Sequence, residues 1–115
     1  MQPSAARREV FEVSVMTAFE YSIRVEDHKK LVSLMRELSE IGVRFIYGEN
    51  GGSVTDVYKI GKYDVIINHS STRDNRVKNY HFNVAPYHEP KPNSKLSNWL
   101  KKHNARTRDG AKFSK

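Results

Sequence analysis

The alternation of apolar and polar residues is the feature that most limits what this chain can fold into. From Phe11 to Val25 every second position is apolar or threonine, and the positions between are mostly polar or small. A period of two is typical of a β-strand with one buried face. Fifteen residues is long for one strand, so two interpretations stay open. Either the strand breaks near residues 16–18, or its first half is an edge that pairs with a partner chain. Met16 also offers an alternative start.

A helical pattern follows this segment. Apolar residues recur three and four positions apart, at Leu31, Leu34, Met35, Leu38 and Ile41. This spacing predicts one amphipathic helix whose apolar stripe faces a core. Asp27 is the expected N-cap, and Gly42 stands where a left-handed residue ends many helices.

Short β-rich segments fill the centre of the chain, and a second helix follows them. Gly61-Lys62 separates two of these segments and predicts a two-residue hairpin turn. The predicted strands are Val43–Tyr47, Val54–Ile60, Tyr63–Asn68 and Tyr80–Val84. After three prolines between residues 86 and 92, Asn93 or Ser94 caps a predicted helix over Lys95–Asn104.

Together these patterns predict an α+β fold, with an antiparallel sheet of three to five strands packed against two helices. A length of 115 residues suits one domain. We expect a flexible arm over residues 1–9, one domain over 10–104, and a flexible, frayed basic tail over 105–115. No apolar run approaches the length of about 20 residues that a membrane span needs.

The net charge of +7 is concentrated at one end of the chain. Residues 1–85 contain 12 Lys+Arg and 11 Asp+Glu, whereas residues 86–115 contain 8 and 2. An excess of +6 over the last thirty residues favours a contact with an anionic polymer. A solvated tail that only aids solubility is the alternative.

The predicted nucleic-acid contacts follow from this charge. Lysine and arginine contact phosphates chiefly by charge, so such a surface binds with little sequence preference and a steep salt dependence. The expected contacts are Lys95, Lys101, Lys102, Arg106 and Arg108, extended by the loop arginines Arg73 and Arg76.

Few residues suggest catalysis or metal binding. The chain has no cysteine, which fits a reducing, cytoplasmic compartment, and its five histidines show no zinc-like spacing. We expect no metal and no cofactor. His69 and His81 lie on, or at the end of, neighbouring predicted strands. If those strands pair, the two imidazoles could share one face and divide acid and base duties in ribonuclease chemistry. Two unrelated exposed histidines are the alternative.

The middle and the end of the chain resemble a known class of domain. Helix 28–41, a strand triplet and the ending HFNVAPYHEPKPNSKLSNWLKKHNA (His81–Ala105) resemble the α-β-β-β-α order of double-stranded-RNA-binding-like domains. Within that class the chain is similar to HicA-type toxins, which are small ribonucleases that inactivate messenger RNA. The likeness covers roughly residues 27–105 and rests on the order of elements and on this ending.

One departure from the HicA pattern concerns catalysis. The family carries its catalytic histidine in a Gly-Ser-His motif at the start of the second strand. The equivalents here are Gly52-Ser53-Val54 or Gly61-Lys62-Tyr63. Valine cannot move a proton, and tyrosine is a poor base at neutral pH. The resemblance therefore supports the fold and RNA binding better than it supports cleavage.

Three hypotheses about function follow. The leading one is a small nucleic-acid-binding protein whose partner is RNA rather than DNA. The second is a toxin-like endoribonuclease that uses His81, with His69 or His88 as its partner. The third is a protein-interaction module, a regulator or inhibitor, whose N-terminal strand pairs with a partner or with its own copy as a homodimer.

Overall fold

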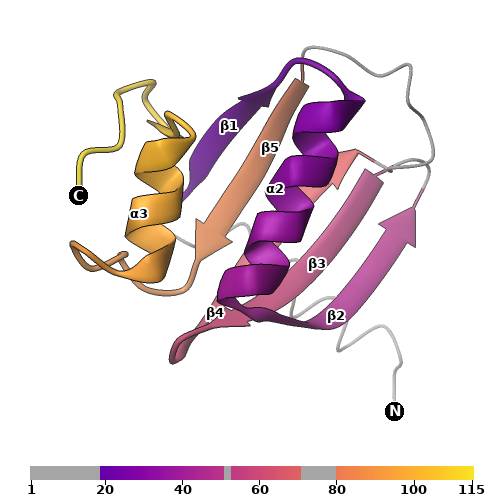
Figure 1. The fold of residues 1–115 in the computed structure, drawn as a ribbon, viewed down its shortest axis with the longest axis horizontal. Coiled ribbons are helices and arrows are strands. Elements are labelled where there is room, and N and C mark those ends of the chain that lie inside the picture. Colours follow the sequence, from indigo (N-terminus) through magenta and orange to yellow (C-terminus); the bar gives the residue numbers. More distant parts are fainter. Residues whose placement is uncertain (1–18, 51–52, 71–79) are drawn as a thin grey trace.

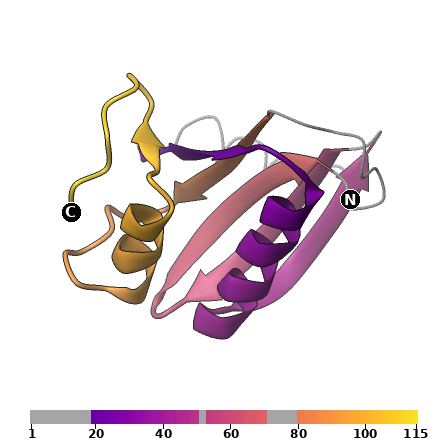
Figure 2. The ribbon, with the colours of Figure 1, turned by 45° about the horizontal axis from the view of Figure 1, so that its top comes forward.

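Two helices lie on one face of an antiparallel sheet (Figures 1 and 2). A computed structural model describes residues 19–50, 53–70 and 80–115. Within these ranges the order is β1 (Tyr21–Val25), α2 (His28–Ile41), β2 (Val43–Asn50), β3 (Ser53–Ile60), β4 (Tyr63–Ser70), β5 (Tyr80–Pro86), α3 (Lys95–Lys102) and β6 (Arg106–Thr107). The α+β class, the two helices and the antiparallel sheet are confirmed.

The number of strands differs from the prediction. The described residues form a six-stranded sheet in the order β2-β3-β4-β5-β1-β6, whereas the sequence predicts three to five strands. The additional strand is β6, which has two residues. A strand of this length forms only because it pairs with β1. Two residues are too few to show a periodic pattern in the sequence.

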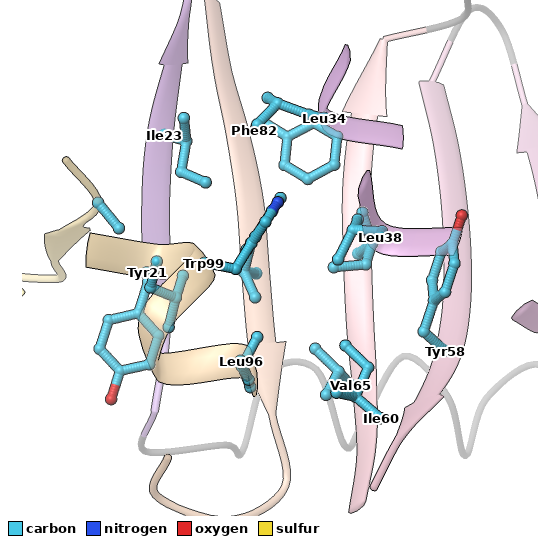
Figure 3. Packing of buried hydrophobic residues seen from close by; sticks show 14 of the residues in the cluster. Tyr21, Ile23, Leu34, Leu38, Tyr58, Ile60, Val65, Phe82, Leu96 and Trp99 are labelled. Carbon is cyan, nitrogen blue, oxygen red and sulfur yellow. The ribbon is translucent and has the colours of Figure 1, made fainter. Parts of the chain in front are cut away.

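The core lies between the sheet and the helices. Figure 3 shows Leu34 and Leu38 of α2 and Trp99 of α3 directed at the same face of the sheet. Phe82 of β5 is fully buried there, and its ring meets that of Trp99 edge to face at 6.3 Å. Full burial of each of these large side chains contributes about 1.5–3 kcal/mol to folding. The sheet and both helices therefore form one hydrophobic unit.

Helix α2 begins as predicted, but it ends for a different reason. Asp27 caps it by accepting a hydrogen bond from the Lys30 amide at 2.9 Å. Gly42 is not left-handed, because its φ of −156° is extended. A side chain there would stand 2.6 Å from Ile60 Cγ1 and 2.7 Å from the carbonyl oxygen of Lys59. Glycine is required at this position because α2 turns into β2 directly against the end of β3.

The β3–β4 hairpin has the expected two-residue turn. Gly61 adopts a φ of +65°, and Ile60 pairs with Tyr63 across the turn. The register then pairs Tyr58 with Val65, and both side chains are buried against the core. The turn therefore determines which residues of both strands face the helices.

The predicted N-terminal strand is described only in part. Tyr21–Val25 forms β1, which lies between β5 and β6. The rest of the alternating segment and the expected arm over 1–9 lie outside the described residues. The second half of this segment therefore pairs within the chain and is not an edge.

The C-terminal residues pack against the domain, which differs from the frayed tail that we expected. Phe113 is only 4% exposed, and its ring meets Tyr21 edge to face at 5.1 Å. The Ser97 hydroxyl donates to the carbonyl oxygen of Lys115 at 2.6 Å. Charged and small residues dominate 105–115, so the composition resembles a tail although a buried aromatic ring and several hydrogen bonds hold the segment in place.

Candidate nucleic-acid interface

A cavity lies where α3 begins beside the β3–β4 turn. Its volume is about 140 Å³. Ile60, Pro86 and Leu96 contribute to its apolar lining, and five charged or aromatic residues with polar atoms lie beside them. These are Lys62, Lys91, Lys95, Tyr63 and His88. We call this set the basic pocket.

Turns and caps position the residues of the basic pocket. The Gly61 turn places Lys62 and Tyr63 at one side. On the other side, Ser94 caps α3 by accepting from the Ser97 amide at 3.1 Å, and its hydroxyl donates to the carbonyl oxygen of Lys91 at 2.7 Å. The connection before α3 is therefore tied to the helix that follows it.

The basic pocket carries positive charge that no described acidic residue neutralises. Lys62, Lys91 and Lys95 make no ion pair within the described part of the chain. The two acidic residues nearest in sequence are already engaged, since Asp64 pairs with Lys59 at 3.6 Å and Glu89 pairs with Lys115. The N-terminus of α3 adds the partial positive charge of a helix dipole. The lining is mostly apolar and the three lysines are exposed, so their charge lies at the mouth of the cavity and favours an anion there.

An aromatic pair lines the same pocket. The rings of Tyr63 and His88 lie 4.6 Å apart at a tilt of 47°. Tyrosine and histidine offer faces on which nucleic-acid bases stack. A phosphate and a base can thus be contacted at one place.

The remaining predicted contacts are only partly available for nucleic acid. Lys101 is exposed on α3. Lys102 pairs with Glu37 at 3.1 Å, and Arg108 pairs with Glu20 at 3.6 Å. Arg106 lies on β6 and donates to the Gly110 carbonyl at 3.4 Å. The other two predicted contacts, Arg73 and Arg76, lie outside the described residues.

The three predicted catalytic histidines do not come together. His69 is buried and stacks on Phe82 at 5.3 Å, on the helix side of the sheet. His81 precedes Phe82 in β5, so it points to the opposite face, where it is exposed. His88 lines the basic pocket. The expected shared face for His69 and His81 is therefore wrong: β4 and β5 do pair, but their register separates the two side chains.

His69 has a buried acidic neighbour. Its Nε2 atom is 3.5 Å from Oδ2 of Asp56, which is fully buried on β3. Arg44 approaches the same oxygen at 3.9 Å. Neither carboxylate oxygen of Asp56 receives a hydrogen bond from a described residue. Both side chains are buried on the helix side of the sheet, so the pair is shielded from solvent and from a ligand.

Sequence reasoning missed a charged network between the two helices. His103 Nε2 lies 2.7 Å from Glu37 Oε1, and His103 Nδ1 lies 2.8 Å from Lys30 Nζ. Lys102 approaches the other oxygen of Glu37. A lysine ammonium has only donors, so His103 is neutral, accepting at Nδ1 and donating from Nε2. Residue 103 is more than sixty positions from its partners, so no local pattern could have revealed the network.

The network shifts the pKa values of His103 and Glu37. Burial lowers the pKa of His103, an effect that the hydrogen bond to Glu37 opposes and the charge of Lys30 reinforces. For Glu37, burial alone would raise the pKa, but the hydrogen bonds from His103 and Lys102 and the charge of Lys102 outweigh it and lower the pKa. At neutral pH the network therefore joins a carboxylate, a neutral imidazole and two ammonium groups.

Comparison with known proteins gives no relative: no family model, curated protein or solved structure matches this chain. Among residues 19–50, 53–70 and 80–115, no group of three or more His, Cys, Asp or Glu is placed to hold a metal ion. No helix in the same ranges is long and apolar enough to cross a membrane. The basic pocket is the site whose residues point most directly to a ligand.

Proposed function

We propose that this protein binds RNA by contacting its phosphates at the basic pocket. The observation that carries the proposal is that Lys62, Lys91 and Lys95, none paired with a described acidic residue, all line one cavity at the start of α3. The Tyr63–His88 pair supplies the stacking surface. Lys101 extends the positive surface along α3.

The same proposal includes a relation to double-stranded-RNA-binding-like domains. Two helices on one face of an antiparallel sheet support this relation (Figure 1). The described chain has four strands between the helices, β2 to β5, where the α-β-β-β-α order has three. We do not extend the proposal to HicA-like cleavage, because His69, His81 and His88 occupy three separate environments.

Fluorescence polarisation with labelled RNA and DNA of equal length tests the proposal. We expect RNA binding that weakens steeply between about 50 and 200 mM salt, as phosphate contacts require. The variant Lys62→Gln/Lys95→Gln should bind more weakly. It should also lower the salt slope by about one for each phosphate that a lysine no longer neutralises.

A charge-matched control separates the pocket from net charge. Lys29→Gln/Arg36→Gln removes two exposed charges from α2 and should leave binding close to that of the original chain. An equal reduction of affinity in both double variants would contradict the assignment to the pocket. No binding to any RNA at low salt would exclude the function itself.

A further inference from the structure

Strand β2 forms an edge of the sheet. It is last in the strand order, and within the described residues no strand pairs with its outer side (Figure 1). Proteins usually protect such an edge with lysine or other charged residues, with proline, with a β-bulge or by keeping the strand very short. β2 has eight residues and contains neither lysine nor proline. Its one irregularity is a bulge between Arg44 and Ile46.

The exposed apolar surface gathers on this same strand. Six large hydrophobic residues are exposed in the described chain, and four of them belong to β2. These are Val43, Phe45, Ile46 and Tyr47. Clustered apolar surface of this kind marks an interaction site, whereas single exposed residues do not.

Gly48 lies within β2, and neither its backbone angles nor its described neighbours require glycine there. A Cβ atom placed there would have only one neighbour within 4 Å, the Thr55 carbonyl oxygen at 3.6 Å, which is ordinary contact. Glycine inside a strand weakens it and often marks the close approach of another backbone. The space above Gly48 is therefore suited to a side chain from outside this chain.

The charges of β2 are arranged to match a reversed copy of themselves. Arg44 pairs with Tyr58 and Glu49 with Val54, so the bulge brings both charges to the helix side of the sheet. Within the chain, Tyr47 donates to Glu49 at 2.8 Å, and Arg44 lies over the Tyr47 ring and 3.9 Å from Asp56. Opposite charges near the two ends of a strand, on one face, also approach each other when the strand pairs antiparallel with its own copy.

We propose that β2 pairs antiparallel with β2 of a second copy of this chain, about a two-fold axis beside residue 47. In this register Ile46 of one copy fills the space over Gly48 of the other. The bulged Arg44 and Phe45 lie against Glu49 of the other copy, and the two-fold axis repeats each of these pairings. The two sheets become one. The basic pocket stays clear of the contact, because it lies at the β3–β4 turn and the start of α3, whereas the proposed axis lies beside residue 47, which pairs with Asp56 further along β3.

Sedimentation velocity on the full chain tests this dimer. We expect a species of twice the 13.3 kDa chain mass that Ile46→Lys converts to single chains. Val32→Lys is the matched control, because Val32 on α2 is 43% exposed and Ile46 is 41% exposed. The control should leave the dimer intact. A full-length chain that is monomeric at several hundred micromolar would overturn the proposal.

Gly48→Val keeps the test decisive if a lysine in β2 impairs folding. The single chain has room for this side chain, so thermal unfolding followed by circular dichroism should still show a folded protein. The added valine occupies the place of Ile46 from the second copy, and we expect loss of the dimer. A dimer that survives both Ile46→Lys and Gly48→Val would place the contact elsewhere, such as the N-terminal segment, and would refute β2 pairing.

Discussion

At the scale of single residues, Gly42 and Gly48 differ in the space that surrounds them, although one directly precedes β2 and the other lies within it. Gly42 stands where any side chain would overlap the backbone of Lys59, whereas Gly48 has ordinary space around it. Neither residue has a positive φ among the described backbone angles. What distinguishes them is the proximity of other atoms, which composition and order do not show.

Gly42→Ala should therefore destabilise the protein. The new methyl group has to displace Ile60 and the carbonyl group of Lys59, and forced overpacking costs about 1–3 kcal/mol. Urea denaturation at low protein concentration measures the change in the free energy of unfolding. Gly48→Ala is the matched control and should change it by less than the Gly42 variant does. Equal effects at both positions would contradict the assigned role of Gly42.

At the same scale, the lowered pKa of His103 predicts how the stability of the protein depends on pH. Burial lowers its pKa in the folded protein, so the unfolded chain takes up this proton more readily. The stabilisation is present above the ordinary histidine value of about 6.5 and is lost as the pH falls through the lowered folded pKa. Protonation also makes Nδ1 a donor, which breaks its hydrogen bond with Lys30.

We expect His103→Gln to flatten the dependence of stability on pH over this acidic range. Urea denaturation at pH 7.5, 6.5 and 5.5 measures it. His81→Gln, at an exposed position on the sheet face opposite the helices, should keep the original slope. If the His103 variant keeps that slope as well, the network does not couple protonation to folding.

At the scale of elements, the largest buried side chain of the C-terminal segment is one aromatic residue. Phe113 is buried against Tyr21, and β6 pairs with β1 directly beside it. The pairing of two residues contributes little by itself. Burial of the phenyl ring therefore contributes most of the apolar contact of residues 105–115, beside the hydrogen bonds of Ser97 with Lys115 and of Phe113 with Ala105.

Phe113→Ala tests the packing of this segment. Removing a buried phenyl ring costs about 3–5 kcal/mol in a well-packed core, and the partly exposed surroundings place this site near the lower value. Thermal unfolding followed by circular dichroism gives the change. Lys112→Ala, at the exposed neighbouring position, should be nearly neutral. Two equally neutral variants would show that the segment is frayed in solution.

At the same scale, the sequence predicts elements well where the periodic pattern is long or a cap is local. α2 and its Asp27 cap, the Gly61 turn and the start of α3 at Ser94 follow from such patterns. β6 and the end of α2 do not. The first has too few residues for a period, and the second depends on contact with β3.

At the scale of the whole molecule, the tertiary structure redistributes the charge. The excess of +6 over residues 86–115 is a property of the chain, but three of its cations are held by Glu20, Glu37 and Glu89. Lys62, from the nearly neutral part of the chain, joins Lys91 and Lys95 at the pocket. The positive surface that we propose for RNA is thus assembled from both parts.

The sequence alone determined the class of fold, the main helices and strands, and the end of the chain where charge accumulates. These properties depend on periodicity, caps and residue counts, which act over a few neighbours. Only the tertiary structure decided that His69 and His81 face opposite ways, that His103 joins Glu37, and that β2 is an edge. Such facts depend on strand register and on contacts between residues distant in sequence, and no local pattern specifies either.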